Sequence, residues 1–139
     1  MAILKNKPIR GNRVPARLIR YIMNAYKTSP IPGEEIDPER FVSAWGCVPV
    51  EDSAIESMQM TVDLFEPGRT SARVIGYHYM QSFSPGETNP ETAHEIGRQL
   101  ISRLLGENPD FQIVQGTHLD KGHLHNHFFL MSLRNVDGH

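Results

Sequence analysis

Segment 117–128 carries four of the chain's seven histidines, and their alternation constrains how the chain can fold. Side chains two residues apart point to the same face of a β-strand, so a strand here places His123, His125 and His127 on one face. Neutral imidazole is the commonest metal ligand in proteins, so such a row predicts an open metal site. The alternative is a row of ordinary strand histidines, either packed or exposed.

The residues before this row predict that it belongs to a β-hairpin. Residues 111–117 have the apolar and β-branched character of a strand, and residues 120–122 are typical of a turn. The hairpin would bring His118 beside the row, so either His118 or His123 could supply a third imidazole. Three consecutive residues of one face span too far to converge easily, so we favour His118 with His125 and His127 as metal ligands.

Composition restricts the class of protein. The chain has 139 residues, 39% of them hydrophobic, which predicts one globular domain with a modest core. It contains no signal-peptide core and no apolar run long enough for a transmembrane span. Cys47 is the single cysteine, which excludes an internal disulfide framework. We therefore expect a cytoplasmic protein without membrane insertion.

The basic residues are concentrated near the start of the chain. Half of them precede residue 30, whereas the first acidic residue is Glu34. They are Lys5, Lys7, Arg10, Arg13, Arg17, Arg20 and Lys27. Such a local excess of positive charge, in a chain of formal net charge −2, predicts a phosphate-binding surface; the alternative is a solvated basic face.

A helix beginning near Pro15 is predicted to present one tyrosine to this basic region. Its apolar stripe comprises Leu18, Ile19, Ile22, Met23 and Tyr26. Tyr21 projects away from the stripe, on the side of Arg17, Arg20 and Asn24. It is therefore either a phenol held where a nucleic-acid phosphate could bind, or an ordinary surface tyrosine.

The remaining segments predict an α+β fold. We expect an arm or short strand over 1–14, a Pro/Gly-rich loop over 29–38, a β-compatible segment over 41–50 and a central strand over 72–83. Residues 51–66 are ambiguous between strand and helix. A helix capped by Asn89 and ending at Gly106 would bury Ala93, Ile96, Leu100 and Leu104. This order predicts a central antiparallel sheet with flanking helices on one face, and His78 is assigned no role.

Four separated segments resemble the motifs of conjugative relaxases. Leu18–Thr28 resembles their first motif, in which a tyrosine precedes a Lys-Thr pair, and Tyr77–Glu87 resembles their Ser-Phe segment. The spacing His118-x-Asp120-x-x-His123-x-His125-x-His127 resembles the third motif, and Trp45-Gly46-Cys47 also fits. The segments recur in order across about residues 15–135, and the recurrence in order makes the match specific.

The resemblance implies a mobilisation-type DNA nickase of the His-hydrophobe-His endonuclease superfamily. It implies a central antiparallel sheet with flanking helices, and a single catalytic domain over residues 1–139 as the N-terminal part of a longer relaxase. The implied activity is metal-dependent nicking and rejoining of one DNA strand at the transfer origin of a plasmid or integrative element, through a 5′-phosphotyrosine intermediate that initiates conjugation. Implied partners are single-stranded DNA, relaxosome accessory proteins and a coupling protein.

The resemblance also assigns roles to residues. Tyr21 would be the nucleophile, and His118, His125 and His127 the metal ligands. Asp120, His123 and Glu87 would orient a ligand or transfer a proton. The expected DNA contacts are Arg10, Arg13, Arg17, Arg20, Lys27 and Ser82. The metal would be Mg²⁺ or Mn²⁺ for activity, with Zn²⁺, Ni²⁺ or Co²⁺ also compatible with imidazole ligands. Asn126 departs from the hydrophobic middle residue and is expected to face away from the metal.

Two other functions fit parts of the sequence. Residues 123–129 also resemble the histidine-triad nucleotide hydrolases, which use a histidine nucleophile and no metal. That interpretation leaves the basic tyrosine helix unexplained. A non-catalytic DNA-binding fragment would bind DNA with steep salt dependence and form no covalent product.

Overall fold

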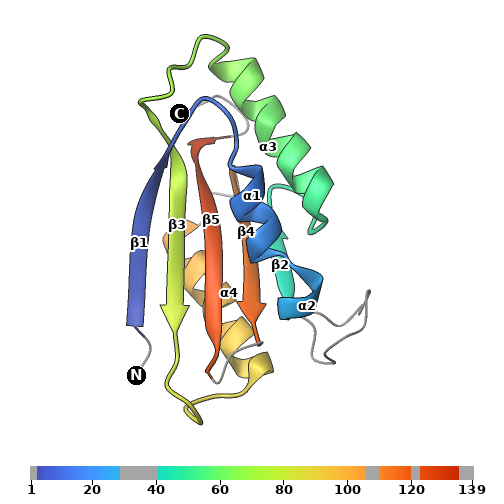
Figure 1. Cartoon of the computed structure of the whole chain (residues 1–139), viewed down its shortest axis with the longest axis vertical. Coiled ribbons are helices and arrows are strands. Elements are labelled where there is room, and N and C mark those ends of the chain that lie inside the picture. The colour runs from blue at the N-terminus through green and yellow to red at the C-terminus, as the bar shows by residue number, and fades with distance from the viewer. Residues whose placement is uncertain (1–2, 29–40, 106–109, 120–122, 135–139) are drawn as a thin grey trace.

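A five-stranded antiparallel sheet forms the centre of the computed structural model, which describes residues 3–28, 41–105, 110–119 and 123–134 (Figure 1). The elements in chain order are β1 (Ile3–Arg10), α1 (Ala16–Ile22), α2 (Ala25–Thr28), β2 (Val42–Trp45), α3 (Glu51–Phe65), β3 (Val74–Ser82), α4 (Pro90–Leu105), β4 (Phe111–His118) and β5 (His125–Arg134). The strands lie in the order β1-β3-β5-β4-β2, and each neighbouring pair is antiparallel. The predicted α+β class is therefore confirmed.

The two strands of the predicted histidine hairpin lie in the interior of the sheet. β4 pairs with β5 as predicted, and the register of this pairing places His118 opposite His125. The turn residues 120–122, and the loop over 29–38, lie outside the described residues. β3 is the predicted central strand, and the ambiguous segment is helical, with Ala54, Met58, Thr61 and Val62 buried at helical spacing.

The predicted single helix from Pro15 is interrupted, because α1 ends at Ile22 and α2 begins at Ala25. Asn24 starts the second helix: its side-chain oxygen accepts from the Lys27 amide at 3.2 Å and its carbonyl accepts from the Thr28 amide at 3.1 Å. Within the expected apolar stripe Ile19, Ile22 and Met23 are buried, whereas the side chain of Tyr26 lies outside the described residues.

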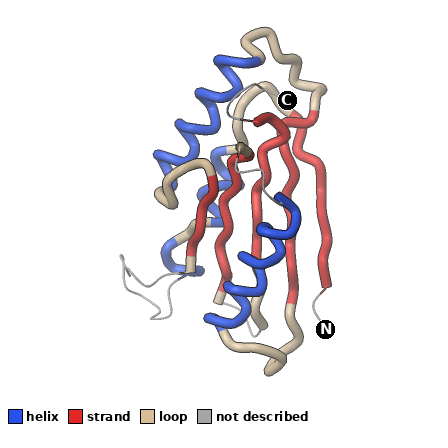
Figure 2. Tube along the Cα trace, turned by 180° about the vertical axis from the view of Figure 1, so that it is seen from behind, coloured by secondary structure: helices blue, strands red, loops and turns tan. Residues whose placement is uncertain are grey.

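Helices cover both faces of the sheet, so the prediction that they share one face was wrong. α1 and α3 lie in front of the sheet in Figure 1, and α4 lies on the opposite face, as Figure 2 shows. Adjacent residues of β5 explain this arrangement, because Phe129 is buried with Ile19 and Met58 on one face, while Phe128 packs with Ile101 on the other. A strand that is apolar on both sides needs cover on both sides.

The buried stripe of α4 differs from the predicted one. Asn89 caps the helix as expected, since its side-chain oxygen accepts from the Thr92 amide at 2.8 Å. The buried positions, however, are Ala93, Gly97 and Ile101, and Leu104 is 52% exposed. Gly97 sets this register, because without a side chain the helix can rest directly on polar side chains of the sheet.

No helix within the described ranges is long and apolar enough to cross a bilayer.

Candidate active site

One face of the sheet carries the histidine cluster. Across the sheet, Ser82 of β3 pairs with His125 of β5, which pairs with His118 of β4. His127 lies two residues further along β5 and pairs with Gly116. Directly opposed residues of antiparallel strands share a face, so these side chains gather on the face that α1 covers.

Tyr21, in the last turn of α1, lies against this cluster. Its ring centroid is 4.8 Å from that of His118 and 5.3 Å from that of His127, and both contacts are edge-on. The two imidazoles are 2% and 5% exposed, whereas Tyr21 is 38% exposed. The structure therefore brings the expected nucleophile together with two of the expected ligands, and Tyr21 stays accessible to solvent.

Gly116 allows α1 to approach so closely. A Cβ atom at this position would overlap the carbonyl oxygen of Ile22, the residue after Tyr21. The same carbonyl accepts a hydrogen bond from Nε2 of His118 at 3.1 Å. The end of α1 is therefore positioned on the sheet by one missing side chain and one imidazole.

Each of the three expected ligands has one ring nitrogen held by a hydrogen bond. His118 donates to Ile22, Nδ1 of His125 bonds the Ser82 hydroxyl at 3.1 Å, and Nδ1 of His127 bonds Nε2 of His78 at 3.0 Å. Metal-binding histidines commonly use one nitrogen in this way, which orients the ring and fixes its tautomer.

The donor type of these imidazoles suits a divalent metal ion, and their spacing lies close to, but outside, the range for direct ligation. With a metal–nitrogen distance of about 2.1 Å, two ligating rings lie roughly 4.5–5.5 Å apart. The centroids of His118 and His127 are 4.3 Å apart, and those of His125 and His127 are 6.1 Å apart. Across the described ranges, no three His, Cys, Asp or Glu side chains are already arranged to hold a metal, so the rings would have to rotate to converge.

His78 belongs to the cluster, although its sequence context predicted no role for it. Its ring stacks on His127 with a centroid distance of 5.3 Å and an interplanar angle of 24°. Burial lowers the pKa of His78, and the nearby positive charge of Lys7 lowers it further. The alternation of β3 already placed His78 on the side of Ser82, but only the pairing register with β5 brings it to His127.

Of the remaining candidates for ligand orientation or proton transfer, the structure describes His123 and Glu87. His123 is exposed, and its ring centroid is 4.3 Å from that of His125. Glu87 lies in the turn after β3, where its carboxylate accepts from the Ser84 amide at 3.4 Å. Asp120 lies outside the described residues.

The expected DNA-contacting residues are spread over a wide surface. Besides Ser82, Lys27 is at the site, with its Nζ 5.6 Å from the Tyr21 ring centroid. Arg20 forms a 2.7 Å ion pair with Asp52, and Arg10 donates to the Ala72 carbonyl at the opposite end of the sheet. Arg13 and Arg17 are exposed.

A buried polar network lies behind the cluster, on the α4 face. Asn126, between His125 and His127, accepts from the Thr117 hydroxyl at 2.5 Å and donates to Gln81 at 2.9 Å and to the Ala93 carbonyl at 2.7 Å. Thr117 precedes His118 and Gln81 precedes Ser82. The network therefore ties together the backbones that present the site residues.

His94 extends this network toward β2. Its Nδ1 lies 2.7 Å from the Thr117 hydroxyl, and its Nε2 lies 2.7 Å from the hydroxyl of Ser43. Because Thr117 uses its hydrogen on Asn126, His94 donates from Nδ1 and accepts from Ser43 at Nε2. A neutral ring is required for this pattern, and burial, with a contribution from Arg98, lowers the His94 pKa to about 4.

We expect Asn126→Leu to lower the free energy of unfolding by about 3 kcal/mol, because the amide of Gln81, the Thr117 hydroxyl and the Ala93 carbonyl would lose buried partners. Urea denaturation followed by circular dichroism measures this loss. Ser132→Ala is the control on the same strand, since its hydroxyl makes one part-buried bond to Val74 and should cost about 1 kcal/mol. Equal losses in the two variants would contradict a special role for the network.

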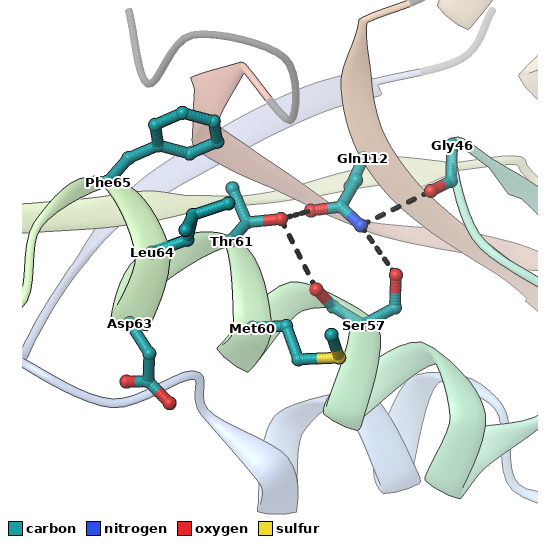
Figure 3. A pocket seen from close by; sticks show the side chains of 8 residues that line it. All are labelled: Gly46, Ser57, Met60, Thr61, Asp63, Leu64, Phe65 and Gln112. Atoms are coloured by element: carbon teal, nitrogen blue, oxygen red, sulfur yellow. Dashed lines mark hydrogen bonds between the residues drawn. The ribbon is translucent and has the colours of Figure 1, made fainter.

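A separate pocket lies at the other end of β4 and holds none of the expected site residues. It has a volume of about 570 Å³ and is lined by Gly46, Ser57, Met60, Thr61, Asp63, Leu64, Phe65 and Gln112. In Figure 3 Thr61 and Ser57 point toward the Gln112 amide, and both bond to it. These polar groups satisfy one another, so the imidazole cluster is the better candidate for chemistry.

Burial raises the pKa of the Cys47 thiol to about 11, which keeps it protonated and unreactive.

Comparisons with known proteins agree with the motifs. The family model described as relaxase, MobA/VirD2-like, nuclease domain matches residues 21–139. The group II intron-interrupted relaxase LtrB of Lactococcus lactis subsp. cremoris is 45% identical over 60 residues, covering 42% of this chain and 10% of that protein. Two Staphylococcus aureus proteins named rlx are 38% identical over 60 residues, covering 43% of this chain and 18% of that protein, and 32% identical over 82 residues, covering 59% and 23%.

The aligned segments thus span only a tenth to about a quarter of these curated relatives. The family match is much broader, because it runs from Tyr21 through both histidine strands to His139. The resemblance predicted from the motifs is therefore confirmed. The chain belongs to the relaxase family and carries its MobA/VirD2-like nuclease domain.

Proposed function

We propose that this chain nicks and rejoins one strand of DNA at a transfer origin by forming a covalent bond between Tyr21 and a 5′-phosphate. The observation that carries the proposal is the position of Tyr21, whose accessible phenol lies edge-on against His118 and His127. The chain's membership of the relaxase nuclease family supports the same activity.

The reaction exchanges one phosphate ester for another. The Tyr21 oxygen forms a bond to phosphorus as the bond from phosphorus to the 3′-oxygen breaks. The phenol loses its proton and the 3′-oxygen gains one, which leaves a 5′-phosphotyrosine and a free 3′-hydroxyl. Because the ester bond is conserved, the reverse reaction reseals the strand without a nucleotide cofactor.

His118, His125 and His127 would hold a divalent metal ion in this reaction. When bound, the ion would neutralise the non-bridging oxygens of the scissile phosphate. The residues that orient the rings are the Ile22 carbonyl, Ser82 and His78. Mg²⁺ and Mn²⁺ suit phosphate chemistry, whereas Zn²⁺, Ni²⁺ and Co²⁺ bind imidazole more tightly, so the ligand set alone does not select the ion.

Single-stranded DNA is the proposed substrate. Lys27 lies beside the Tyr21 ring, where its ammonium would attract the phosphate next to the nucleophile. Arg13 and Arg17 are exposed along the approach to α1 and would contribute sequence-independent affinity. In a longer relaxase, accessory proteins and a coupling protein would complete the assembly.

The test is a denaturing gel of the chain incubated with labelled single-stranded oligonucleotides. These oligonucleotides tile the transfer region of the plasmid or integrative element that encodes the chain. We expect a slowly migrating adduct with Mn²⁺, which protease digestion removes and a chelator prevents. Adduct formation that persists in chelator would overturn the metal assignment. Chelator-insensitive nucleotide hydrolysis without an adduct would favour a histidine-triad hydrolase, and DNA binding without an adduct would favour a non-catalytic fragment.

A further inference from the structure

We propose that a pocket beside the imidazole cluster binds a nucleobase of the DNA strand, close to the scissile phosphate. The base pocket, as we call it, has a volume of about 400 Å³ and is lined by Ile3, Ser82, Phe83, Ser84, Pro85 and His123. This volume lies within the range of small-ligand sites. The identity of the ligand rests on the proposed function.

The base pocket is continuous with the candidate active site. Ile3 pairs with Ser82, which pairs with His125, so the wall of the pocket and the cluster belong to one row across the sheet. With strands about 4.8 Å apart, Ile3 and His125 are separated by roughly 10 Å. Ser82 also bonds His125, and the His123 ring lies 4.3 Å from the His125 ring. A strand whose phosphate lies on the cluster therefore passes the mouth of this pocket.

The lining chemistry suits a base. Ile3, Phe83 and Pro85 provide apolar walls, and the exposed His123 offers an aromatic face for stacking. Ile3 is 60% exposed, so its apolar side chain is accessible to a ligand in the pocket. The hydroxyls of Ser82 and Ser84 could bond the edge of a base, and none of the described residues that line the pocket is acidic.

Two further cations mark where the DNA backbone would run. Lys5 pairs with Met80 and Lys7 pairs with His78, so both lysines project from the edge strand on the face of the cluster. A basic groove beside an aromatic stacking surface is the arrangement by which proteins bind single-stranded nucleic acid. This combination favours a DNA base over an uncharged apolar ligand.

The pocket is tested by comparing two fluorescein-labelled probes with equal numbers of phosphates, a 20-nucleotide thymidine oligomer and a 20-nucleotide abasic chain, in chelator. Stacking of one base is worth about 1–3 kcal/mol, so wild-type protein should bind the thymidine oligomer about tenfold more tightly or better. Ile3→Ser and His123→Ala should each reduce the ratio of thymidine affinity to abasic affinity at least about threefold. The affinity for the abasic chain should stay nearly unchanged. Lys7→Ala should weaken both probes equally and lower the salt dependence.

Val48→Ala is the matched control, because Val48 is an apolar side chain of similar exposure, 56%, outside the base pocket. An unchanged ratio in both Ile3→Ser and His123→Ala would overturn the proposal. The binding assay needs neither metal nor cleavage, so it separates the two ideas. A metal-dependent adduct with unchanged ratios would refute the pocket alone, whereas altered ratios without an adduct would refute the nicking reaction and retain a single-strand binding site.

Discussion

Tyr21→Phe is expected to abolish the covalent protein–DNA adduct, with a loss of at least about 1,000-fold in its rate of formation, because phenylalanine has no oxygen to bond phosphorus. The ring contacts with His118 and His127 depend on the aromatic ring and should persist. The free energy of unfolding should therefore change by no more than about 0.5 kcal/mol. The same denaturing gel, quantified over time, measures the rate.

The control for this prediction is Tyr26→Phe, which removes the other phenolic hydroxyl of the same motif and should leave the adduct intact. Mass spectrometry of the digested adduct should locate the nucleotide on the peptide that contains Tyr21. An adduct that persists at the wild-type rate in Tyr21→Phe, or one located on another residue, would show that the nucleophile is wrongly assigned. Loss of the adduct with unchanged stability would separate chemistry from folding.

Local patterns in the sequence were sufficient to predict the strands of the hairpin and the orientation of Tyr21. Alternation along β5 places His125 and His127 on one face, because the period of a strand is two residues regardless of its neighbours. Helical periodicity likewise distinguishes Tyr21 from the buried Ile19 and Ile22. Such features depend on backbone geometry within one element, and a single sequence contains them.

Features that depend on pairing between distant segments were missed. His78 joins the cluster only because β3 pairs with β5, although the two strands are separated by α4 and β4. The stripe of α4 was misassigned because hydrophobicity favoured Leu104, whereas the missing side chain of Gly97 decides which line of the helix touches the sheet. A glycine contributes no hydrophobic signal, so its packing role is invisible to a periodicity analysis.

The approach of Tyr21 to the histidines also depends on a glycine. Gly116 lies under the Ile22 carbonyl, which stands nearly a hundred residues earlier in the chain and accepts from His118 at 3.1 Å. The first and third motifs are therefore in direct contact. The contact of the Ile22 carbonyl with Gly116 and His118 would therefore fix the position of the proposed nucleophile relative to the proposed ligands.

Gly116→Ala should accordingly impair adduct formation by about 100-fold, because a methyl group in contact with a backbone carbonyl must push α1 away, and a displacement of about 1 Å at a reacting group can have this effect. Overpacking should also lower the free energy of unfolding by about 1–3 kcal/mol. The rate is measured by the adduct gel well below the melting temperature, so that unfolded protein does not contribute.

Gly68→Ala is the matched control, since a Cβ atom there would meet nothing within 4 Å and neither rate nor stability should change appreciably. A DNA-binding measurement separates displacement of Tyr21 from general damage to the fold. The base pocket lies over β1 and β3, and β5 separates it from Gly116 on β4, so the preference of the pocket for thymidine over abasic DNA should survive. Wild-type adduct formation in Gly116→Ala would mean that α1 can shift without moving the phenol. In that case the His118–Ile22 bond would be a structural contact, and the nucleophile would be positioned by the DNA instead.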